Sequence, residues 1–211
     1  MVKIYRIDPE NPDKKVISEA IGILRNRGLV VYPTDTVYGL GANPLDAEAV
    51  RKVYWAKRRV GKPLPILVSS IDAVKRIAYV DEAALRLMER FWPGPLTIVL
   101  RAKDVIPKEV TLGTGKVGVR MPNHKVALML AEGLNGLIIG TSANISGKPS
   151  PKTIEEVIEQ LGDRVDLILD AGPARMGIPS TVVDLTGNRL RIIREGPISY
   201  NELLSVVNEG Y

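Results

Sequence analysis

A dense cluster of positive charge lies between residues 57 and 62. Lys57, Arg58, Arg59 and Lys62 place four cations within six residues, beside a glycine and a proline. Lysine and arginine side chains are the usual protein partners of phosphate oxygens. A solvated helix end has the same composition, because cations there complement the helix dipole. The cluster therefore indicates either a phosphate site or an ordinary helix terminus.

A second set of candidate residues is polar and follows an apolar stretch. Thr141–Gly147 comes directly after Leu137–Ile139 and offers hydroxyl and amide groups. Ligands of open α/β sheets bind beyond the carboxyl ends of strands, which favours a binding loop here, although a plain polar turn has the same composition. Arg120 alternates with apolar residues, as on the polar side of a strand. Its guanidinium suits a carboxylate or phosphate, or it is an exposed edge arginine.

Several kinds of chemistry are excluded by composition. Cysteine is absent and His124 is the one histidine, which rules out disulfides, thiolate nucleophiles, paired imidazoles and a histidine–cysteine zinc site. We expect His124 to be a surface or helix-capping residue. Gly113, Gly115 and Gly118 match G-x-G-x-x-G, but a predicted strand follows instead of a helix, so we interpret them as a loop. The sequence also lacks a Walker A motif.

Length and composition favour a single domain over residues 1–211. Hydrophobic residues make up 45% and charged residues 25% of the 211 positions, as in packed globular proteins. The net charge of +5 indicates an anionic partner, which charge alone does not identify. No segment approaches the ~20 apolar residues of a membrane span, and residues 1–6 lack a signal-peptide pattern. We therefore expect a cytoplasmic protein without a membrane partner.

Hydrophobic periodicity predicts a mixed α/β fold with an antiparallel part. Strands are predicted over residues 29–32, 66–68, 96–100, 117–121, 137–139, 167–169, 181–185 and 190–194, the last two joined by a turn at Gly187 and Asn188. Residues 34–43 are predicted to form a loop. Helices are predicted over residues 16–24, 73–77 and 83–91, the last capped by Asp81. Further helices are predicted after the capping residues Asp46, Asn123, Thr153 (paired with Glu156) and Ser199 (paired with Glu202). The predicted core includes Trp55, Phe91 and Trp92.

Four motifs occur together in the chain: Pro33–Gly41 (PTDTVYGLG), Lys57-x-Arg59, Val117–Pro122 (VGVRMP) and Ser142–Gly147 (SANISG). In this order and spacing they resemble the YrdC/Sua5 family. The similarity runs from about Val16 to Gly196, ending with Pro179–Asp184 and Ile193–Gly196. It covers almost the whole chain and leaves residues 197–211 as a C-terminal helix or tail.

The resemblance implies a twisted, mixed parallel and antiparallel sheet flanked by helices, with a large concave basic pocket. The implied activity is L-threonylcarbamoyladenylate synthase, a nucleotidyltransferase that joins L-threonine, bicarbonate and ATP and releases pyrophosphate, for threonylcarbamoyl-adenosine in tRNA. Mg²⁺ is expected on the ATP phosphates, with unknown protein ligands. Contact with tRNA and hand-over of the product to a threonylcarbamoyl transferase complex stay open. Such chemistry needs positioning and charge neutralisation more than a histidine or cysteine.

The resemblance also assigns roles to individual residues. Lys57 and Arg59 would face the triphosphate as catalytic residues. The ATP-binding residues would be Arg59, Lys62, Ser142, Asn144, Ser150 and Arg194. The threonine-binding residues would be Thr36, Arg120, Gly140 and Ser180, with Arg120 as the partner of the carboxylate. Asp35 is a hypothesis of our own: it would orient an amine or a metal-bound water.

The sequence departs from the family pattern in two places. The loop after Arg59 is one residue shorter than usual, and Leu67 stands where Sua5 proteins often have a histidine near threonine. The linker and extra domain of long members do not fit after Gly196, so a short form is expected. One alternative is a YciO-type paralogue with a different or unknown nucleotide-dependent reaction. Another is a double-stranded RNA or tRNA-binding module, although the single Phe argues against an aromatic RNA platform.

Overall fold

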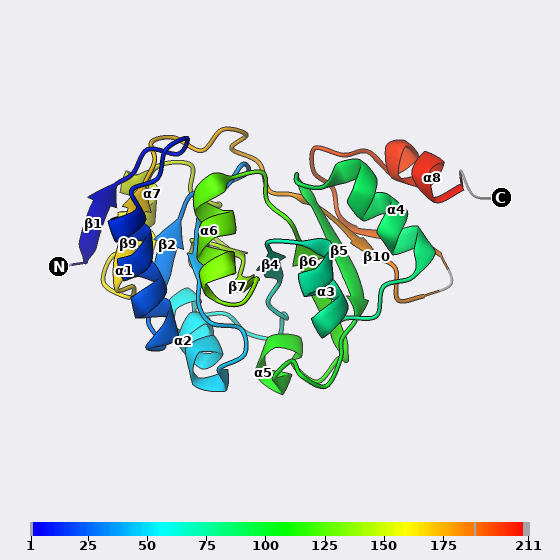
Figure 1. Cartoon of the computed structure of the whole chain (residues 1–211), viewed down its shortest axis with the longest axis horizontal. Helices are drawn as coiled ribbons and strands as arrows, with labels where there is room; N and C mark the ends of the chain where they lie inside the picture. Colours follow the sequence, from blue (N-terminus) through cyan, green and yellow to red (C-terminus); the bar gives the residue numbers. More distant parts are fainter. Residues whose placement is uncertain (1, 188, 209–211) are drawn as a thin grey trace.

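The computed structural model describes residues 2–187 and 189–208. Within these ranges, two β-sheets lie side by side along the long axis and helices pack on them (Figure 1). The strands are β1 (Lys3–Arg6), β2 (Val30–Tyr32), β3 (Gly39–Gly41), β4 (Ile66–Val68), β5 (Leu96–Arg101), β6 (Lys116–Arg120), β7 (Leu137–Ile139), β8 (Thr141–Ser142), β9 (Leu167–Asp170), β10 (Thr181–Asp184) and β11 (Arg191–Arg194). The helices are α1 (Lys14–Arg25), α2 (Ala47–Lys57), α3 (Ile71–Ile77), α4 (Glu82–Phe91), α5 (Lys108–Thr111), α6 (Lys125–Gly133), α7 (Ile154–Leu161) and α8 (Tyr200–Asn208).

Both sheets are mixed. Within the described ranges, the first has the strand order β1-β9-β2-β3-β8, with parallel pairing up to β2 and antiparallel pairing beyond it. The second has the order β11-β10-β5-β6-β4-β7, with parallel pairs β10–β5 and β4–β6 and antiparallel pairs elsewhere. The mixed α/β class is confirmed, but the strands divide between two sheets instead of the one expected. The chain passes from the second sheet to the first at Gly140, between β7 and β8.

The segment 34–43, predicted to be a loop, contains strand β3. This strand pairs antiparallel with β2, so Tyr32 lies opposite Gly39 and residues 33–38 close the hairpin. Glycine weakens a strand signal, yet two glycines are needed here because the Tyr32 ring lies across the neighbouring strand. A Cβ at Gly41 would come within 2.7 Å of the Tyr32 ring, and one at Gly39 within 3.0 Å. The prediction was wrong because tertiary packing, not propensity, sets this strand.

Most predicted helix starts are confirmed by their capping bonds. Asp46 accepts from the amides of the first turn of α2, and Asp81 does so for α4. The Ser199–Glu202 box is reciprocal, with bonds of 2.9 and 3.3 Å. In the predicted Thr153–Glu156 box only the threonine half forms, since the Glu156 carboxylate accepts from the amide of Lys152 instead. The Asn123 prediction was wrong, because His124 occupies the N-cap position of α6 and makes no side-chain capping bond.

The hydrophobic core fills the space between the sheets and their helices. One cluster includes residues of both sheets, and a second lies under α1 and α6, where those helices cover β2 and β9. Phe91 and Trp92 pack against the first cluster, as predicted. Trp55 does not, because its side chain projects from α2 and is 64% exposed, with Arg164 over its ring. The structure adds β1 and α5, which had no clear periodic signal, and the two-residue strand β8, which begins the segment Thr141–Gly147 that was predicted to be a turn or binding loop.

Two smaller predictions have separate outcomes. The strands β10 and β11 form the predicted antiparallel pair, whereas Asn188 of their connecting turn lies outside the described residues. Strand β6 begins at Lys116, so a strand and not a helix follows Gly113 and Gly115, which have positive φ angles as in a tight loop. No helix in the described part of the chain is long and apolar enough to cross a membrane.

Candidate functional site

The loop between β2 and β3 holds three buried polar side chains in fixed positions. Thr34, Asp35 and Thr36 are each at most 6% exposed. The hydroxyl of Thr34 donates to the carbonyl of Val37 (2.7 Å) and accepts from the amide of Thr36 (3.1 Å), which closes the loop on itself. The carbonyl of Thr36 accepts from the amide of Gly177 (2.9 Å), which ties the loop to a distant segment. The loop therefore presents rigid polar groups.

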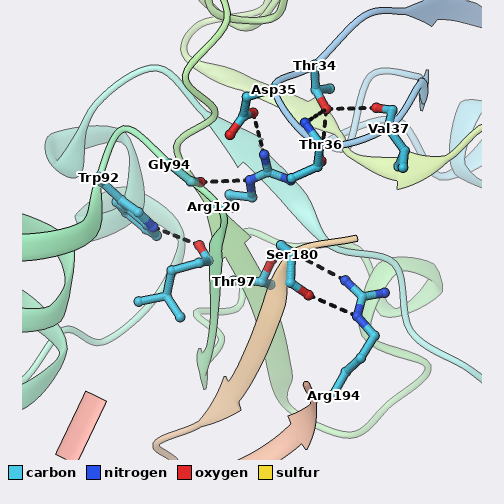
Figure 2. Close-up of polar contacts among 11 residues, drawn as sticks. Thr34, Asp35, Thr36, Val37, Trp92, Gly94, Thr97, Arg120, Ser180 and Arg194 are labelled. Carbon is cyan, nitrogen blue, oxygen red and sulfur yellow. Dashed lines mark hydrogen bonds and ion pairs between the residues drawn. The ribbon is translucent and has the colours of Figure 1, made fainter. Parts of the chain in front are cut away.

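Arg120 meets this loop from the second sheet. Strand β6 lies between β5 and β4, and the arginine is 5% exposed, so an exposed edge arginine is ruled out. Its Nε donates to the carbonyl of Gly94 (2.9 Å), one terminal nitrogen to the hydroxyl of Thr36 (2.8 Å), and the other to the carboxylate of Asp35 (Figure 2). Burial lowers the pKa of Arg120, while the charge of Asp35 opposes that shift. The guanidinium is thus held in a fixed orientation.

Strand register brings a second polar group to the same end of the sheet. Because Ile98 lies opposite Val119, Thr97 lies beside Arg120, and the parallel strand β10 begins next to it. The Ser180 hydroxyl, just before β10, is 2.8 Å from that of Thr97. Arg194 at the end of β11 donates to the Ser180 carbonyl (3.0 Å) and hydroxyl (3.1 Å), as Figure 2 shows. The predicted residues Arg120, Ser180 and Arg194 therefore gather at one end of the six-stranded sheet.

Lys57 ends helix α2 with its side chain turned into the protein. It is 1% exposed, so a solvated helix end is ruled out for this residue. Its Nζ donates to the carbonyls of Ser142 (2.5 Å) and Asn144 (2.8 Å), and the Ser142 hydroxyl donates to Asn144 Oδ1 (2.5 Å). Burial, and secondarily the charge of Arg59, lowers the pKa of Lys57 to about 7. The cationic cluster and the polar loop 142–147 thus form one unit.

The remaining predicted nucleotide residues lie on loops beside this unit. Arg59 is half-buried and folds back on its own loop, where it donates to the carbonyls of Lys62 (2.9 Å) and Pro63 (2.8 Å). Lys62 is exposed, and Ser150 is half-buried in the loop before α7. These positions are compatible with ligand contact, and the assignment of all three residues stays a prediction.

The charges of the site are strongly unbalanced. Burial lowers the pKa of Arg194, and the charges of Arg120 and Arg59 lower it further, so these three guanidinium groups share one electrostatic environment. Arg59 also lowers the pKa of Lys57. Within the described residues, the four basic side chains (Lys57, Arg59, Arg120 and Arg194) donate to one carboxylate, that of Asp35, and otherwise to carbonyl, hydroxyl or amide oxygens. A site with three guanidinium groups, one lysine and one carboxylate is stabilised by an anionic ligand.

A basic hollow lies farther along the six-stranded sheet. Lys116 and Arg120 are four residues apart and so face the same side of β6. Around Lys116 there is a hollow of about 570 Å³, lined by Arg101, Thr114, Gly115, Lys116, Asp184, Thr186, Gly187, Arg189 and Arg191. The lining does not include Lys57 or Arg120. The large basic pocket expected around those two residues therefore stays a prediction.

Gly140 lies where the two sheets meet. Its amide donates to the carbonyl of Pro65 (2.9 Å), and the preceding residue, Ile139, donates to Ala42 (3.0 Å). A Cβ at Gly140 would come within 2.3 Å of Leu67 Cγ, in a buried side chain. The glycine is therefore needed for close packing beneath the predicted threonine site.

We expect Gly140→Ala to lower the free energy of unfolding by about 1–3 kcal/mol, because the new methyl group overpacks the junction. Gly22→Ala is a matched control: this helical glycine has no atom within 4 Å of a built Cβ, and we expect a gain of about 0.5–1 kcal/mol. Urea unfolding of both variants measures the difference. Equal stability of the two variants would contradict the steric role of Gly140.

Comparison with known proteins places this arrangement in a family. A family model named Sua5_yciO_yrdC and described as "Telomere recombination" matches residues 22–196. The chain belongs to the Sua5/YciO/YrdC family. Its relatives include the threonylcarbamoyl-AMP synthase of Pyrococcus abyssi, 43% identical over 90% of this chain and 56% of the relative.

Solved structures of Sua5/YciO/YrdC proteins have the same fold. Pyrococcus abyssi Sua5 complexed with L-threonine superposes with a TM-score of 0.92 at 41% identity, over 99% of this chain and 61% of that one. Escherichia coli YciO superposes with a TM-score of 0.84 at 29% identity, over 93% and 96%. The present chain thus spans somewhat more than half the length of the Pyrococcus protein.

Two contributors to the candidate site were not found from the sequence. Thr97 supports Ser180, and the Gly94 carbonyl orients Arg120. Thr97 lies within an apolar strand and Gly94 beside Pro93 in a turn, so neither stands out by type or spacing. Only the pairing of β5 with β6 and β10 reveals their positions.

Proposed function

We propose that this chain is an L-threonylcarbamoyladenylate synthase. The enzyme would be a nucleotidyltransferase that joins L-threonine, bicarbonate and ATP, releases pyrophosphate, and supplies the intermediate for threonylcarbamoyl-adenosine in tRNA. The observation that carries the proposal is the buried Arg120, fixed by Thr36 and Asp35 next to the Ser180–Arg194 pair. It offers a carboxylate site beside a cluster of cations. A related Sua5 structure is described as a complex with L-threonine, which supports the same substrate here.

The arrangement suits a reaction in two steps. The amine of threonine attacks the carbon of bicarbonate and water leaves, which gives a carbamate. A carbamate oxygen then attacks the α-phosphorus of ATP, and the bond to the β-phosphate oxygen breaks to release pyrophosphate. Arg120, Thr36 and Ser180 would hold threonine, while Lys57, Arg59 and Arg194 would neutralise the charge that develops on the phosphates. Alignment of two anions in a dry site is the main requirement.

Mg²⁺ is part of the proposal as an ion carried by ATP. Within residues 2–187 and 189–208, no group of three or more His, Asp or Glu side chains could hold a metal. Mg²⁺ commonly keeps its waters and binds through substrate phosphates with one or two carboxylates, so the chain fits an ion held mainly by the triphosphate. There it would neutralise charge on the leaving pyrophosphate. We also propose that the protein contacts tRNA and that it delivers its product to a threonylcarbamoyl transferase complex.

The decisive experiment measures pyrophosphate release from ATP with bicarbonate and Mg²⁺, with and without L-threonine. We expect release that requires both threonine and bicarbonate, since the carbamate is the nucleophile. L-Valine, which replaces the hydroxyl by a methyl group, is the control and should support much slower release. Release independent of any amino acid would contradict the proposal.

Similarity to YciO supports one alternative function. The chain covers 96% of Escherichia coli YciO, and Leu67 replaces the histidine expected near threonine in Sua5 proteins. If the chain binds ATP but shows no threonine-dependent release, a YciO-type reaction is favoured. Tight binding of RNA without nucleotide binding would instead favour an RNA-binding module.

A further inference from the structure

We propose that Asp35 and Arg120 form a clamp for an α-amino acid zwitterion, in which Asp35 binds the α-ammonium group and Arg120 the α-carboxylate. This inference rests on the proposed function and adds to it a residue that determines specificity. The two side chains come from different sheets and touch through a charge-assisted hydrogen bond. An α-amino acid carries its own opposite charges on neighbouring atoms. The pair therefore presents the complementary charges side by side.

The hydrogen-bonding capacity of the pair supports the clamp. A guanidinium has five N–H donors, and Arg120 uses three of them, on Gly94, Thr36 and Asp35. Two donors on its terminal nitrogens are left for a carboxylate. Asp35 uses Oδ1 on Arg120, while its Oδ2 is buried and has no hydrogen-bond partner within the part of the chain that the structure describes. One side chain thus has spare donors and the other a spare acceptor.

Burial raises the free-energy cost of leaving Oδ2 of Asp35 without a hydrogen-bond donor. The side chains of Arg120 and Asp35 are 7% and 8% exposed. An unsatisfied buried polar atom costs about 1–3 kcal/mol, and more when it is charged. A bound ammonium group would remove that cost. A ligand that donates a hydrogen bond to Asp35 would therefore be stabilised by removal of this cost.

An ammonium group fits this place better than a metal-bound water, the second role considered for Asp35. A divalent cation would lie close to the Arg120 guanidinium, and like charges repel strongly in a buried site. A ligand ammonium carries half the charge of a divalent cation, and the carboxylate of the same ligand offsets that charge beside Arg120.

The clamp requires a small movement of Asp35. Oδ2 is enclosed in the free protein, so the carboxylate must turn toward the ligand. The torsion that turns a carboxylate is soft, and Oδ1 can stay on Arg120 while it changes. The backbone need not move, because the carbonyls of Asp35 and Thr36 are held by the amides of Met176 (3.3 Å) and Gly177 (2.9 Å).

The test compares two ligands that differ in the amine alone: L-threonine and (3R)-3-hydroxybutyrate. Affinities are measured by ligand-observed NMR for the wild type, Asp35→Asn and Asp184→Asn. The amide side chain of the Asp35→Asn variant keeps an oxygen for Arg120 but loses the charge. Asp184 is a matched control. It is a buried carboxylate that pairs with Lys116 and Arg191 at the end of β10 away from Ser180.

We expect Asp35→Asn to weaken threonine binding at least about ten-fold, the loss of a charge-assisted bond, and to change 3-hydroxybutyrate binding less than about three-fold. Asp184→Asn should change neither. An equal loss for both ligands would mean that Asp35 only positions Arg120, and no loss for either would mean that Asp35 does not contact the ligand. Both outcomes overturn the clamp.

A panel of L-amino acids and their desamino analogues separates the clamp from the proposed function. If the wild type binds another L-amino acid in preference to its desamino analogue, and Asp35→Asn removes the preference, the clamp stands although threonine is not the substrate. If no L-amino acid binds, both the clamp and the synthase proposal are wrong.

Discussion

Threonine-dependent pyrophosphate release is expected to fall at least about 100-fold when Arg120 is replaced by lysine, although the positive charge is kept. An ammonium group cannot reproduce the planar set of donors that reaches Gly94, Thr36 and Asp35 and still serves a carboxylate. Loss of two charge-assisted bonds, each worth about 1.5–3 kcal/mol, accounts for a factor of this size or larger. Steady-state kinetics at varied threonine concentrations measure the effect, which should appear mainly as a raised KM for threonine.

The control for this variant addresses folding. Replacement of Arg120 alone by an uncharged residue, as in Arg120→Gln, costs about 3–5 kcal/mol, because Asp35 is then left as an unpaired buried charge. The double variant Arg120→Gln with Asp35→Asn removes both charges and should be more stable than Arg120→Gln alone. If it folds and binds ATP normally but has no threonine-dependent release, the loss is one of recognition. A folded Arg120→Lys enzyme with the wild-type KM for threonine would contradict the assignment of Arg120 to the threonine carboxylate.

Lys57→Met is expected to lower the rate of pyrophosphate release at least about 100-fold and to abolish a proton uptake that accompanies ATP binding. With a pKa of about 7 in the free protein, Lys57 is mostly neutral at pH 8. A bound triphosphate favours the ammonium form and raises that pKa, so binding at pH 8 takes up close to one proton. Calorimetry in two buffers of different ionisation enthalpy measures this uptake, which should shrink below pH 6.

The same depressed pKa affects stability in a defined direction. Lysine titrates near 10.5 when unfolded and near 7 in the folded protein, so between these values the unfolded chain binds more protons. Stability therefore rises with pH across this window, and the cost of the buried charge is fully present below pH 7. Lys57→Met should flatten that rise. Unchanged proton uptake in Lys57→Met would contradict the assignment, whereas Lys52→Met, an exposed lysine on the same helix, should behave as wild type.

Sequence reasoning succeeded where one physical signal dominated. Helix α2 has both an apolar period and the cap Asp46, and β4 is a short apolar run, so their bounds were predicted closely. Among the site residues, the type and spacing of Lys57 and Arg120 left a helix end and an edge arginine open, and the burial of both side chains excludes these two alternatives. Family resemblance then supplied roles that spacing alone leaves undecided.

The failures have a common physical origin in contacts between distant segments. Gly39 and Gly41 conceal a strand because their role is to make room for Tyr32. Trp55 has the composition of a core residue, yet its helix turns it outward toward Arg164. His124 occupies the N-cap position of α6, one of the two places expected for it, but it is 7% exposed and its Nδ1 has no hydrogen-bond partner among the described residues. Such features depend on which strands and helices meet, and local patterns do not encode them.

The junction at Gly140 constrains how the protein moves around a ligand. One side of the site comes from the first sheet, through the loop after β2, and the other from the second, through β6 and β10. The two sheets are tied by the amide–carbonyl bond from Ile139 to Ala42 and by the chain through Gly140, whose amide extends the β7–β4 pairing to Pro65, and a shared core fills the space between them. A hinge motion would have to break the Ile139–Ala42 bond and separate that core. The two halves of the candidate site are therefore held in a fixed relation before a ligand binds.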